Sequence, residues 1–376
     1  MTDYRLWVSA AAAFAITVFA LFALRPIAYA LDLVDRPGGH KTHHGVVPVI
    51  GGLGILLGLV FGLASHAGAI GPLEHYVFSA VLLVVVGMAD DRLGLNPGLR
   101  LIAQFCAVLP MFFGAGVRFS SFGDLLGMGT LDVGGGALVA TAFVTIAAIN
   151  ASNMLDGLDG VAGGIALVAV ALILSLPGSV AHPNSIHLLV VLSGSVIGFL
   201  VFNLPVRWNR RVRCFMGDAG STLLGFSLAW VMIETSQGPL RMAAPVTMLW
   251  LVAVPAADLA WTVVRRLWRG QSPLRPDREH LHHMLLRAGL GPRAVFASMI
   301  GLAAVGGGVG LLLERAHVPD WVSFALLLAG GTLLAVLGRS AVRLVALWPA
   351  WLHWKPVEGQ RGLSALPGLR RRRSAR

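Results

Sequence analysis

Long apolar runs recur along most of this chain and restrict its fold more than any other feature. Many of them extend over about 18–22 residues, the length that a helix needs to cross a hydrocarbon core of roughly 30 Å. Only 12% of the 376 residues are charged, whereas soluble domains carry roughly 25%. Because backbone polar groups inside a bilayer must be paired within the chain, runs of this length form helices. The sequence therefore predicts an all-α polytopic membrane protein.

About eleven of these runs are predicted to be transmembrane helices. The first run is too long for the core of a signal peptide, and Arg25 and Pro26 follow it in place of a small-residue cleavage site. We therefore expect no cleavable signal peptide. The predicted helices cover residues 5–25, 48–66, 75–91, 98–116, 134–150, 161–177, 185–203, 218–234, 243–267, 294–313 and 320–338.

The basic residues predict how these helices are oriented. Cytoplasmic segments of membrane proteins are enriched in Lys and Arg. With the N-terminus periplasmic and the C-terminus cytoplasmic, the outside segments hold only four of the 29 Lys and Arg residues, namely Arg5, Arg118, Arg241 and Arg315. The formal net charge of +11 is therefore interpreted as a topology signal, and we expect no nucleic-acid partner.

Carboxylates gather at the cytoplasmic ends of the predicted helices. Magnesium prefers oxygen ligands, often one or two carboxylates together with substrate phosphates, so this gathering predicts a site for a hard cation and a phosphate. The alternative is that Asp156 and Asp218 are helix N-caps. The residues concerned are Asp90 and Asp91, Asp156 and Asp159, and Asp218.

A second polar cluster lies between residues 265 and 283. His280 and His283 are three residues apart and share a helix face, which leaves a zinc site open as an interpretation. No Cys pair or HExxH pattern accompanies them. The planar guanidinium group suits phosphate oxygens, so the cluster is better suited to holding a polyanion. Its arginines are Arg265, Arg266, Arg269, Arg275 and Arg278.

Five motifs, in order along residues 35–290, resemble those of the polyprenyl-phosphate N-acetylhexosamine-1-phosphate transferases of the glycosyltransferase 4 type. One position departs from the pattern of some members, which have a third Asp where this chain has Gly94. We therefore give position 94 no chemistry. The motifs are Asp35-Arg36-Pro37 with Lys41 to Gly52, Asp90-Asp91, Asn150 to Gly160, Phe202-Asn203 with Phe215 to Ser221, and His280-Leu281-His282-His283.

The resemblance implies a reaction and its substrates. N-acetylglucosamine-1-phosphate passes from UDP-N-acetylglucosamine to undecaprenyl phosphate, giving the lipid-linked diphosphosugar and UMP. This would be the first lipid-linked step of O-antigen or other cell-surface polysaccharide synthesis. Mg²⁺ is the implied cofactor, and Mn²⁺ is an alternative. The same reaction with another UDP-N-acetylhexosamine, or with UDP-N-acetylmuramoyl-pentapeptide, stays open.

The resemblance also implies roles for individual residues. The expected catalytic residues are Asp90, Asp91 and Asp156, and the expected metal ligands are Asp218, Asn153 and Asp91. The expected substrate-binding residues are Lys41, His44, Gly157, Leu158, Asp159, Phe215, Arg265, Arg266, Arg278, His280, His282 and His283.

A membrane transporter is the rival interpretation from another class. Transporters place ionisable residues near the bilayer centre, whereas the acidic residues found within the predicted spans here are Glu234, at an end, and Asp258. Asp258 is expected to brace the helix that carries Arg265 and Arg266. Residues 1–340 are expected to form one transmembrane catalytic domain, and residues 341–376 a basic cytoplasmic tail. The expected location is the bacterial inner membrane, with the active site facing the cytoplasm and a homodimer possible.

Overall fold

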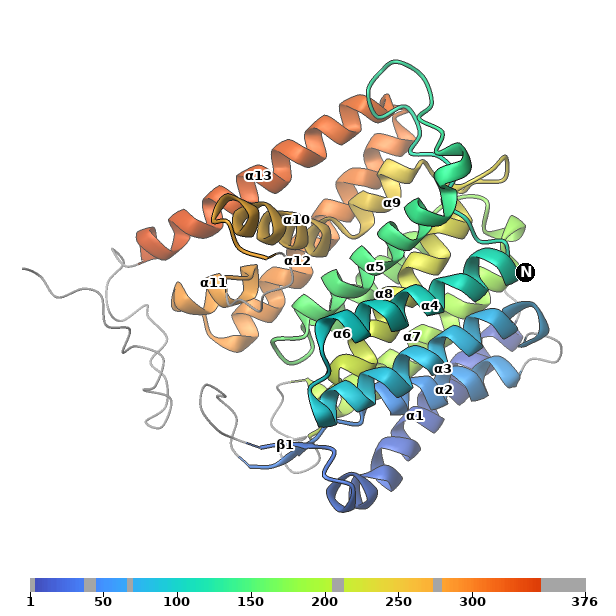
Figure 1. Cartoon of the computed structure of the whole chain (residues 1–376), viewed down its shortest axis with the longest axis vertical. Coiled ribbons are helices and arrows are strands. Elements are labelled where there is room, and N and C mark those ends of the chain that lie inside the picture. The colour runs from blue at the N-terminus through green and yellow to red at the C-terminus, as the bar shows by residue number, and fades with distance from the viewer. Residues whose placement is uncertain (1–3, 37–44, 66–69, 205–212, 273–278, 346–376) are drawn as a thin grey trace, which may run out of the picture.

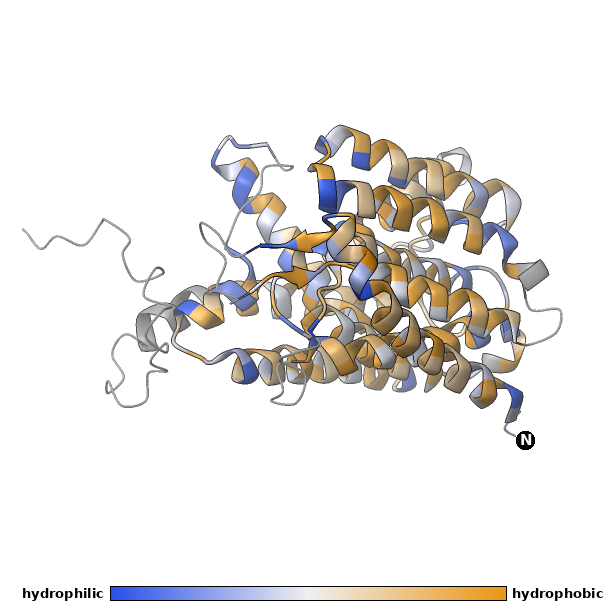
Figure 2. Ribbon diagram, turned by 90° about the horizontal axis from the view of Figure 1, so that it is seen from below, coloured by the Kyte–Doolittle hydropathy of each residue, from blue (hydrophilic) through white to orange (hydrophobic). Residues whose placement is uncertain are grey.

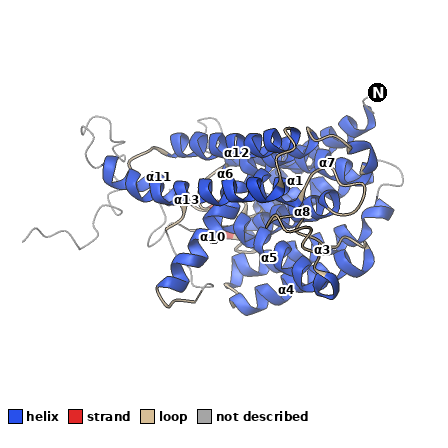
Figure 3. Cartoon of the chain, turned by 90° about the horizontal axis from the view of Figure 1, so that it is seen from above, coloured by secondary structure: helices blue, strands red, loops and turns tan. Residues whose placement is uncertain are grey.

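The computed structural model describes residues 4–36, 45–65, 70–204, 213–272 and 279–345. Most of these residues are helical, as Figure 3 shows. The helices are α1 (Tyr4–Ala30), α2 (Gly51–Ala64), α3 (Ile70–Leu93), α4 (Pro97–Leu109), α5 (Ala137–Leu155), α6 (Val161–Leu174), α7 (Pro183–Asn203), α8 (Gly217–Ser236), α9 (Pro245–Leu251), α10 (Ala253–Trp268), α11 (Leu281–Arg287), α12 (Pro292–Arg315) and α13 (Asp320–Val345).

Shorter elements complete the fold. α4 continues into a π-helical turn, Pro110–Gly114, and 3-10 turns lie at Gly134–Gly136 and Ser179–Ala181. The strands β1 (Val34–Asp35) and β2 (Val47–Pro48) form an antiparallel pair in which Val34 lies opposite Pro48. They place the segment before α2 beside the start of α8, because the N–H of Phe215 donates to the carbonyl of Pro48 at 2.9 Å.

The apolar runs are confirmed as membrane-type helices. Within the described residues, seven helices are long and apolar enough to cross a membrane, or eight if α9 and α10 count as one bent span. α2 and α6 have 14 residues each, and the count of eleven spans stays a prediction. Figure 2 shows apolar residues along most of the helical ribbons, as a chain surrounded by lipid requires.

The prediction of one continuous helix over residues 243–267 is wrong. The segment is broken at Val252, and α9 and α10 meet there at 90°. Pro255 lies in the first turn of α10, where its missing N–H leaves no intrahelical bond unmade, whereas inside a continuous helix it would remove one. Figure 1 shows α10 crossing the direction that the long helices share.

α8 is the buried centre of the bundle, with α2, α3 and α5 packed around it. Glycines let the backbones approach closely. A Cβ on Gly87 of α3 would lie 2.4 Å from the Cα of Ala219, and one on Gly225 of α8 would lie 2.6 Å from the Cα of Ile149 in α5. The first turn of α8 is therefore held at a fixed distance from the end of α3.

We expect Gly87→Val to push α3 away from α8 and to lower the melting temperature in detergent. A side chain forced into a packed interface costs about 1–3 kcal/mol. The matched control is Gly308→Val in α12, where an added Cβ meets nothing within 4 Å. Equal melting temperatures for the two variants would contradict the packing described here.

Candidate functional site

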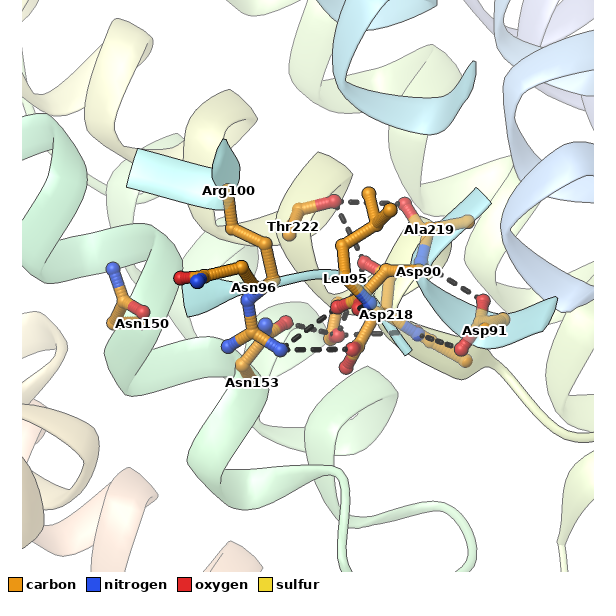
Figure 4. Close-up of polar contacts among 12 residues, drawn as sticks. Asp90, Asp91, Leu95, Asn96, Arg100, Asn150, Asn153, Asp218, Ala219 and Thr222 are labelled. Atoms are coloured by element: carbon orange, nitrogen blue, oxygen red, sulfur yellow. Dashed lines mark hydrogen bonds and ion pairs between the residues drawn. The ribbon is translucent and has the colours of Figure 1, made fainter. Parts of the chain in front are cut away.

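The ends of two helices and the starts of two others meet at one end of the bundle, and Figure 4 shows the polar side chains that they bring together. Asp90 and Asp91 lie near the end of α3, and Arg100 lies in the first turn of α4. Asn153 lies in the last turn of α5, and Asp218 lies in the first turn of α8. The structure thus brings together the carboxylates that the sequence analysis assigned to three separate segments.

Arg100 joins two of these carboxylates. Its Nη1 lies 2.8 Å from Oδ2 of Asp90 and 3.3 Å from Oδ2 of Asp218. The other oxygen of Asp90 accepts a hydrogen bond of 2.7 Å from the N–H of Leu95. Arg100 was not among the predicted site residues. The sequence signal that could have found it is its position at the start of the helix after Asp90 and Asp91. A tight turn after Leu93 places the start of α4 at the same end of the bundle as these two aspartates.

Asp91 has a different set of partners. Its two oxygens accept hydrogen bonds from the backbone N–H groups of Asp218, at 2.8 Å, and Ala219, at 3.3 Å. Asp91 therefore caps the start of α8 from a neighbouring helix. The backbone of Gly217 has φ +72°, and a Cβ there would lie 2.4 Å from Oδ2 of Asp91, so both the turn and the close approach require glycine.

The alternative that Asp156 and Asp218 are N-caps is wrong. Asp218 is the second residue of α8, and no side chain at the N-cap position, Met216, forms a capping bond. Asp156 follows the last residue of α5 and is its C-cap. Neither carboxylate caps the helix to which it belongs, although that of Asp156 accepts a hydrogen bond from the backbone of Gly217 at the start of α8.

A small cavity of about 20 Å³ lies between these helices. Asp90, Arg100, Asn153 and Asp218 line it, together with apolar residues of α3 and α4. Next to it, burial raises the pKa of Asp156 well above its usual value, and the charges of Asp218 and Asp91 raise it further. A bound cation would reverse this effect, because an opposite charge favours the ionised carboxylate.

The donor atoms suit a hard divalent cation. Carboxylate and amide oxygens of Asp90, Asn153, Asp156 and Asp218 are the kind of ligand that Mg²⁺ takes. In the part of the chain that the structure describes, no three His, Cys, Asp or Glu side chains already form a metal cage. Asn153 accepts a hydrogen bond from the hydroxyl of Ser221. As a ligand, Asp91 would have to share its oxygens with the amides of α8.

The loop after α5 lies beside the segment before α8. Arg213 forms an ion pair with Asp159, and its guanidinium lies 5.1 Å from the ring centre of Phe215. Asn203 accepts a 2.6 Å hydrogen bond from the N–H of Gly160 and donates one of 2.9 Å to the carbonyl of Cys214. The expected nucleotide-binding residues Asp159 and Phe215 are thus neighbours through Arg213, which was not predicted as a site residue.

The histidine motif also faces the loop after α5. His282 is 1% exposed, and a Cβ on Gly157 would lie 2.3 Å from its Nε2. Both ring nitrogens are buried without a hydrogen-bond partner. The His282 ring centre lies 4.2 Å from that of His283 and 6.0 Å from that of His280. Burial, and then the charges of His283 and His280, lower the pKa of His282 to about 3, so the ring is neutral at pH 7.

The remaining expected substrate-binding residues fall into two groups. Leu158 is partly buried against the core, and Arg265 and Arg266 are 2% and 8% exposed on α10. Lys41, His44 and Arg278 lie outside the described residues, as does the basic tail beyond Val345.

We expect acid to destabilise the protein through His282. Between its usual pKa of 6.5 and its folded pKa of about 3, the unfolded chain binds a proton that the folded chain does not. Stability contributed by the neutral ring is therefore complete above pH 6.5 and falls as the pH drops through this window. Melting temperatures at pH 7 and pH 5 should differ less for His282→Gln than for the wild type. The control is His75→Gln, near the start of α3 and at the end away from Asp90 and Asp91. This substitution should leave the difference between the melting temperatures at pH 7 and pH 5 unchanged.

Comparison with known proteins identifies the family of this chain. Residues 74–236 match glycosyl transferase family 4. The chain is 37% identical to the undecaprenyl-phosphate alpha-N-acetylglucosaminyl 1-phosphate transferase of Salmonella typhi, over 84% of this chain and 86% of that one. It is 35% identical to the protein of the same name from Escherichia coli (strain K12), over 84% of this chain and 86% of that one, and 35% identical to the one from Haemophilus influenzae, over 81% and 86%. The chain therefore belongs to glycosyl transferase family 4, alongside these undecaprenyl-phosphate sugar-1-phosphate transferases.

Proposed function

We propose that this protein transfers N-acetylglucosamine-1-phosphate from UDP-N-acetylglucosamine to undecaprenyl phosphate. The observation that carries the proposal is the cavity in which Arg100 joins Asp90 and Asp218, all three of which lie within the residues matched to the family. The names of the relatives supply the acceptor and the sugar. The products are undecaprenyl-diphospho-N-acetylglucosamine and UMP.

The reaction is a displacement at phosphorus. An oxygen of undecaprenyl phosphate attacks the phosphorus that carries the sugar, and the bond from that phosphorus to the bridging oxygen breaks, so that UMP leaves. Positioning and charge neutralisation provide most of the catalysis of such transfers. Arg100 supplies positive charge beside Asp90, which holds the lipid phosphate in position, while Asp156 adds a further carboxylate. Phe215 and Asp159 bind the nucleotide side, with Gly157 and Leu158 shaping the loop.

A divalent cation completes this site. Asp218 and Asn153 are the proposed ligands that line the cavity, and Asp91 holds the helix that carries Asp218. The relatives belong to a family that depends on divalent metals, and we propose Mg²⁺, with Mn²⁺ as the alternative. When bound, the cation neutralises the oxygens of the diphosphate.

The histidine motif and its arginines are proposed to bind the sugar and diphosphate. His280, His282 and His283 lie against the loop that carries Gly157. Arg265 and Arg266 hold this region from α10, and Lys41, His44 and Arg278 are proposed to join them from segments outside the described residues.

We further propose that the chain crosses the inner membrane of a bacterium eleven times. The N-terminus is then periplasmic, and the active site and the C-terminus are cytoplasmic. In support, Figure 1 places the N-terminus and the end of α13 at opposite ends of the bundle, and the basic residues favour this direction. Residues 1–340 then form one catalytic domain, and residues 341–376 the basic tail. The expected homodimer stays part of this proposal.

The donor sugar is the least constrained part of the proposal. The same cavity chemistry suits another UDP-N-acetylhexosamine or UDP-N-acetylmuramoyl-pentapeptide, because the phosphates are identical. The transporter interpretation gains no support, since the charged cluster lies at helix ends and the relatives are named as transferases.

The test is UMP release by the purified protein with Mg²⁺, undecaprenyl phosphate and a panel of UDP-sugars. We expect release with UDP-N-acetylglucosamine, and none when the lipid acceptor or the cation is omitted. Release with a different sugar alone would correct the donor. If no sugar in the panel gives UMP release, the transferase proposal is refuted.

We expect Asp218→Asn to lower kcat by at least about 100-fold, the scale of losing one group aimed at charge in a transition state. The neutral amide removes one of the two carboxylates on Arg100 and a proposed metal ligand. The control is Asp132→Asn, an exposed aspartate in the loop between α4 and α5 at the other end of the bundle. Folding of both variants is checked by melting temperature. Wild-type turnover in folded Asp218→Asn would contradict its role.

A further inference from the structure

Asp258 lies on α10, away from the cavity that the catalytic carboxylates line. Its side chain is 4% exposed, and both of its oxygens face the segment that leads into α11. Oδ2 lies 3.1 Å from Nδ1 of His280. Oδ1 accepts a hydrogen bond of 2.9 Å from the backbone N–H of Leu281. A buried acid is thus directed at one histidine of the substrate-binding motif and at the residue after it.

A second side chain of α10 holds the same segment. Arg265 lies seven residues after Asp258, which is two helical turns, or about 10 Å, along the same face. Its Nη1 donates a hydrogen bond of 3.1 Å to the carbonyl of Glu279, and its Nε lies 3.2 Å from a carboxylate oxygen of the same residue. Residues 279–281 are therefore fixed against α10 at two points, and His280 lies between them.

These contacts decide which nitrogen of His280 carries hydrogen. An ionised carboxylate only accepts hydrogen bonds, so Nδ1 of His280 must donate to Asp258. In the neutral ring, Nε2 is then the nitrogen with a free lone pair. The ring also lies nearly parallel to that of His282, at 13°, and His282 lies against Gly157. The ring of His280, which Asp258 orients, is therefore connected through His282 to the loop after α5.

We propose that Asp258 is a positioning residue for the transfer reaction. It fixes the orientation and tautomer of His280, so that Nε2 accepts a hydrogen bond from a hydroxyl or amide N–H of the donor sugar. This inference rests on the proposed function, and it names the chemical group of the donor that the histidine motif recognises. The bend between α9 and α10 contributes by placing Asp258 beside α11.

A double-mutant cycle tests this role. In Asp258→Asn the amide oxygen can still accept from Leu281, but the amide nitrogen donates to Nδ1 of His280 and so reverses the tautomer. We expect this variant to lower kcat with the UDP-sugar by at least about tenfold, since reversing an imidazole in this way removes its function. The KM for undecaprenyl phosphate should stay unchanged. In the His280→Ala background, the same substitution should cause no further loss.

The matched control is Glu314→Gln. Like Asp258, Glu314 accepts a hydrogen bond from a backbone N–H, that of Ala244, and one from a side chain, that of Thr247. It lies in the last turn of α12, at the end away from α11. We expect this variant to keep the wild-type kcat, and melting temperatures show whether each variant is folded.

Two results would overturn the inference, and they are distinguishable. If Asp258→Asn causes the same loss with and without His280, then the effect of Asp258 does not pass through His280, and the positioning role is wrong while the transferase proposal stands. If none of the UDP-sugar donors gives UMP release with the wild type, the transferase proposal fails and this inference fails with it.

Discussion

The ion pairs of Arg100 with Asp90 and Asp218 are the interaction on which the rest of the site depends. Asp90 and Arg100 each have an unfavourable place in their own helix. A carboxylate at the end of α3 faces the negative end of a helix dipole, and a guanidinium in the first turn of α4 faces a positive one. Their mutual contact offsets both effects. Removing the guanidinium would leave two carboxylates close together without a positive charge between them. Arg100 therefore links the end of α3 to the starts of α4 and α8.

Asp91 differs from Asp90 in that its carboxylate faces a favourable helix dipole. It also lies at the end of α3, yet its oxygens face the first amides of α8, where a helix dipole favours an anion. The adjacent residues Asp90 and Asp91 thus have separate tasks, one directed at the cavity and the other at the helix that carries Asp218. Close glycine contacts along α3 and α8 make this cap possible, since longer side chains would hold the two backbones apart.

Hydropathy and charge were enough to predict an all-α membrane protein and most of its long helices, because membrane spans are long, apolar and bounded by basic loops. They also predicted that Asp90, Asp156 and Asp218 share one side. The partners of these residues could not be read in the same way. The distance from Arg100 to Asp218, a contact across 118 residues, depends on how α4 packs against α3 and α5. The break at Val252 was missed because both halves of the segment are apolar, and a hydropathy window does not register a change of direction.

The break at Val252 has a consequence for how the two ends of the site are joined. A backbone interruption within membrane helices is tolerated where protein surrounds it, and α9 and α10 are packed against α12 and α13. The turn of 90° directs α10 across the bundle, so that Asp258 and Arg265 reach the segment before α11. A straight helix would carry the same residues along the common axis and away from that segment. The histidine motif therefore depends on a bent helix for its place beside Gly157, just as Asp218 depends on Asp91. In both cases a polar side chain from one helix fixes the start of another, and the charges lie at helix ends, where a water-soluble nucleotide and a lipid phosphate can meet.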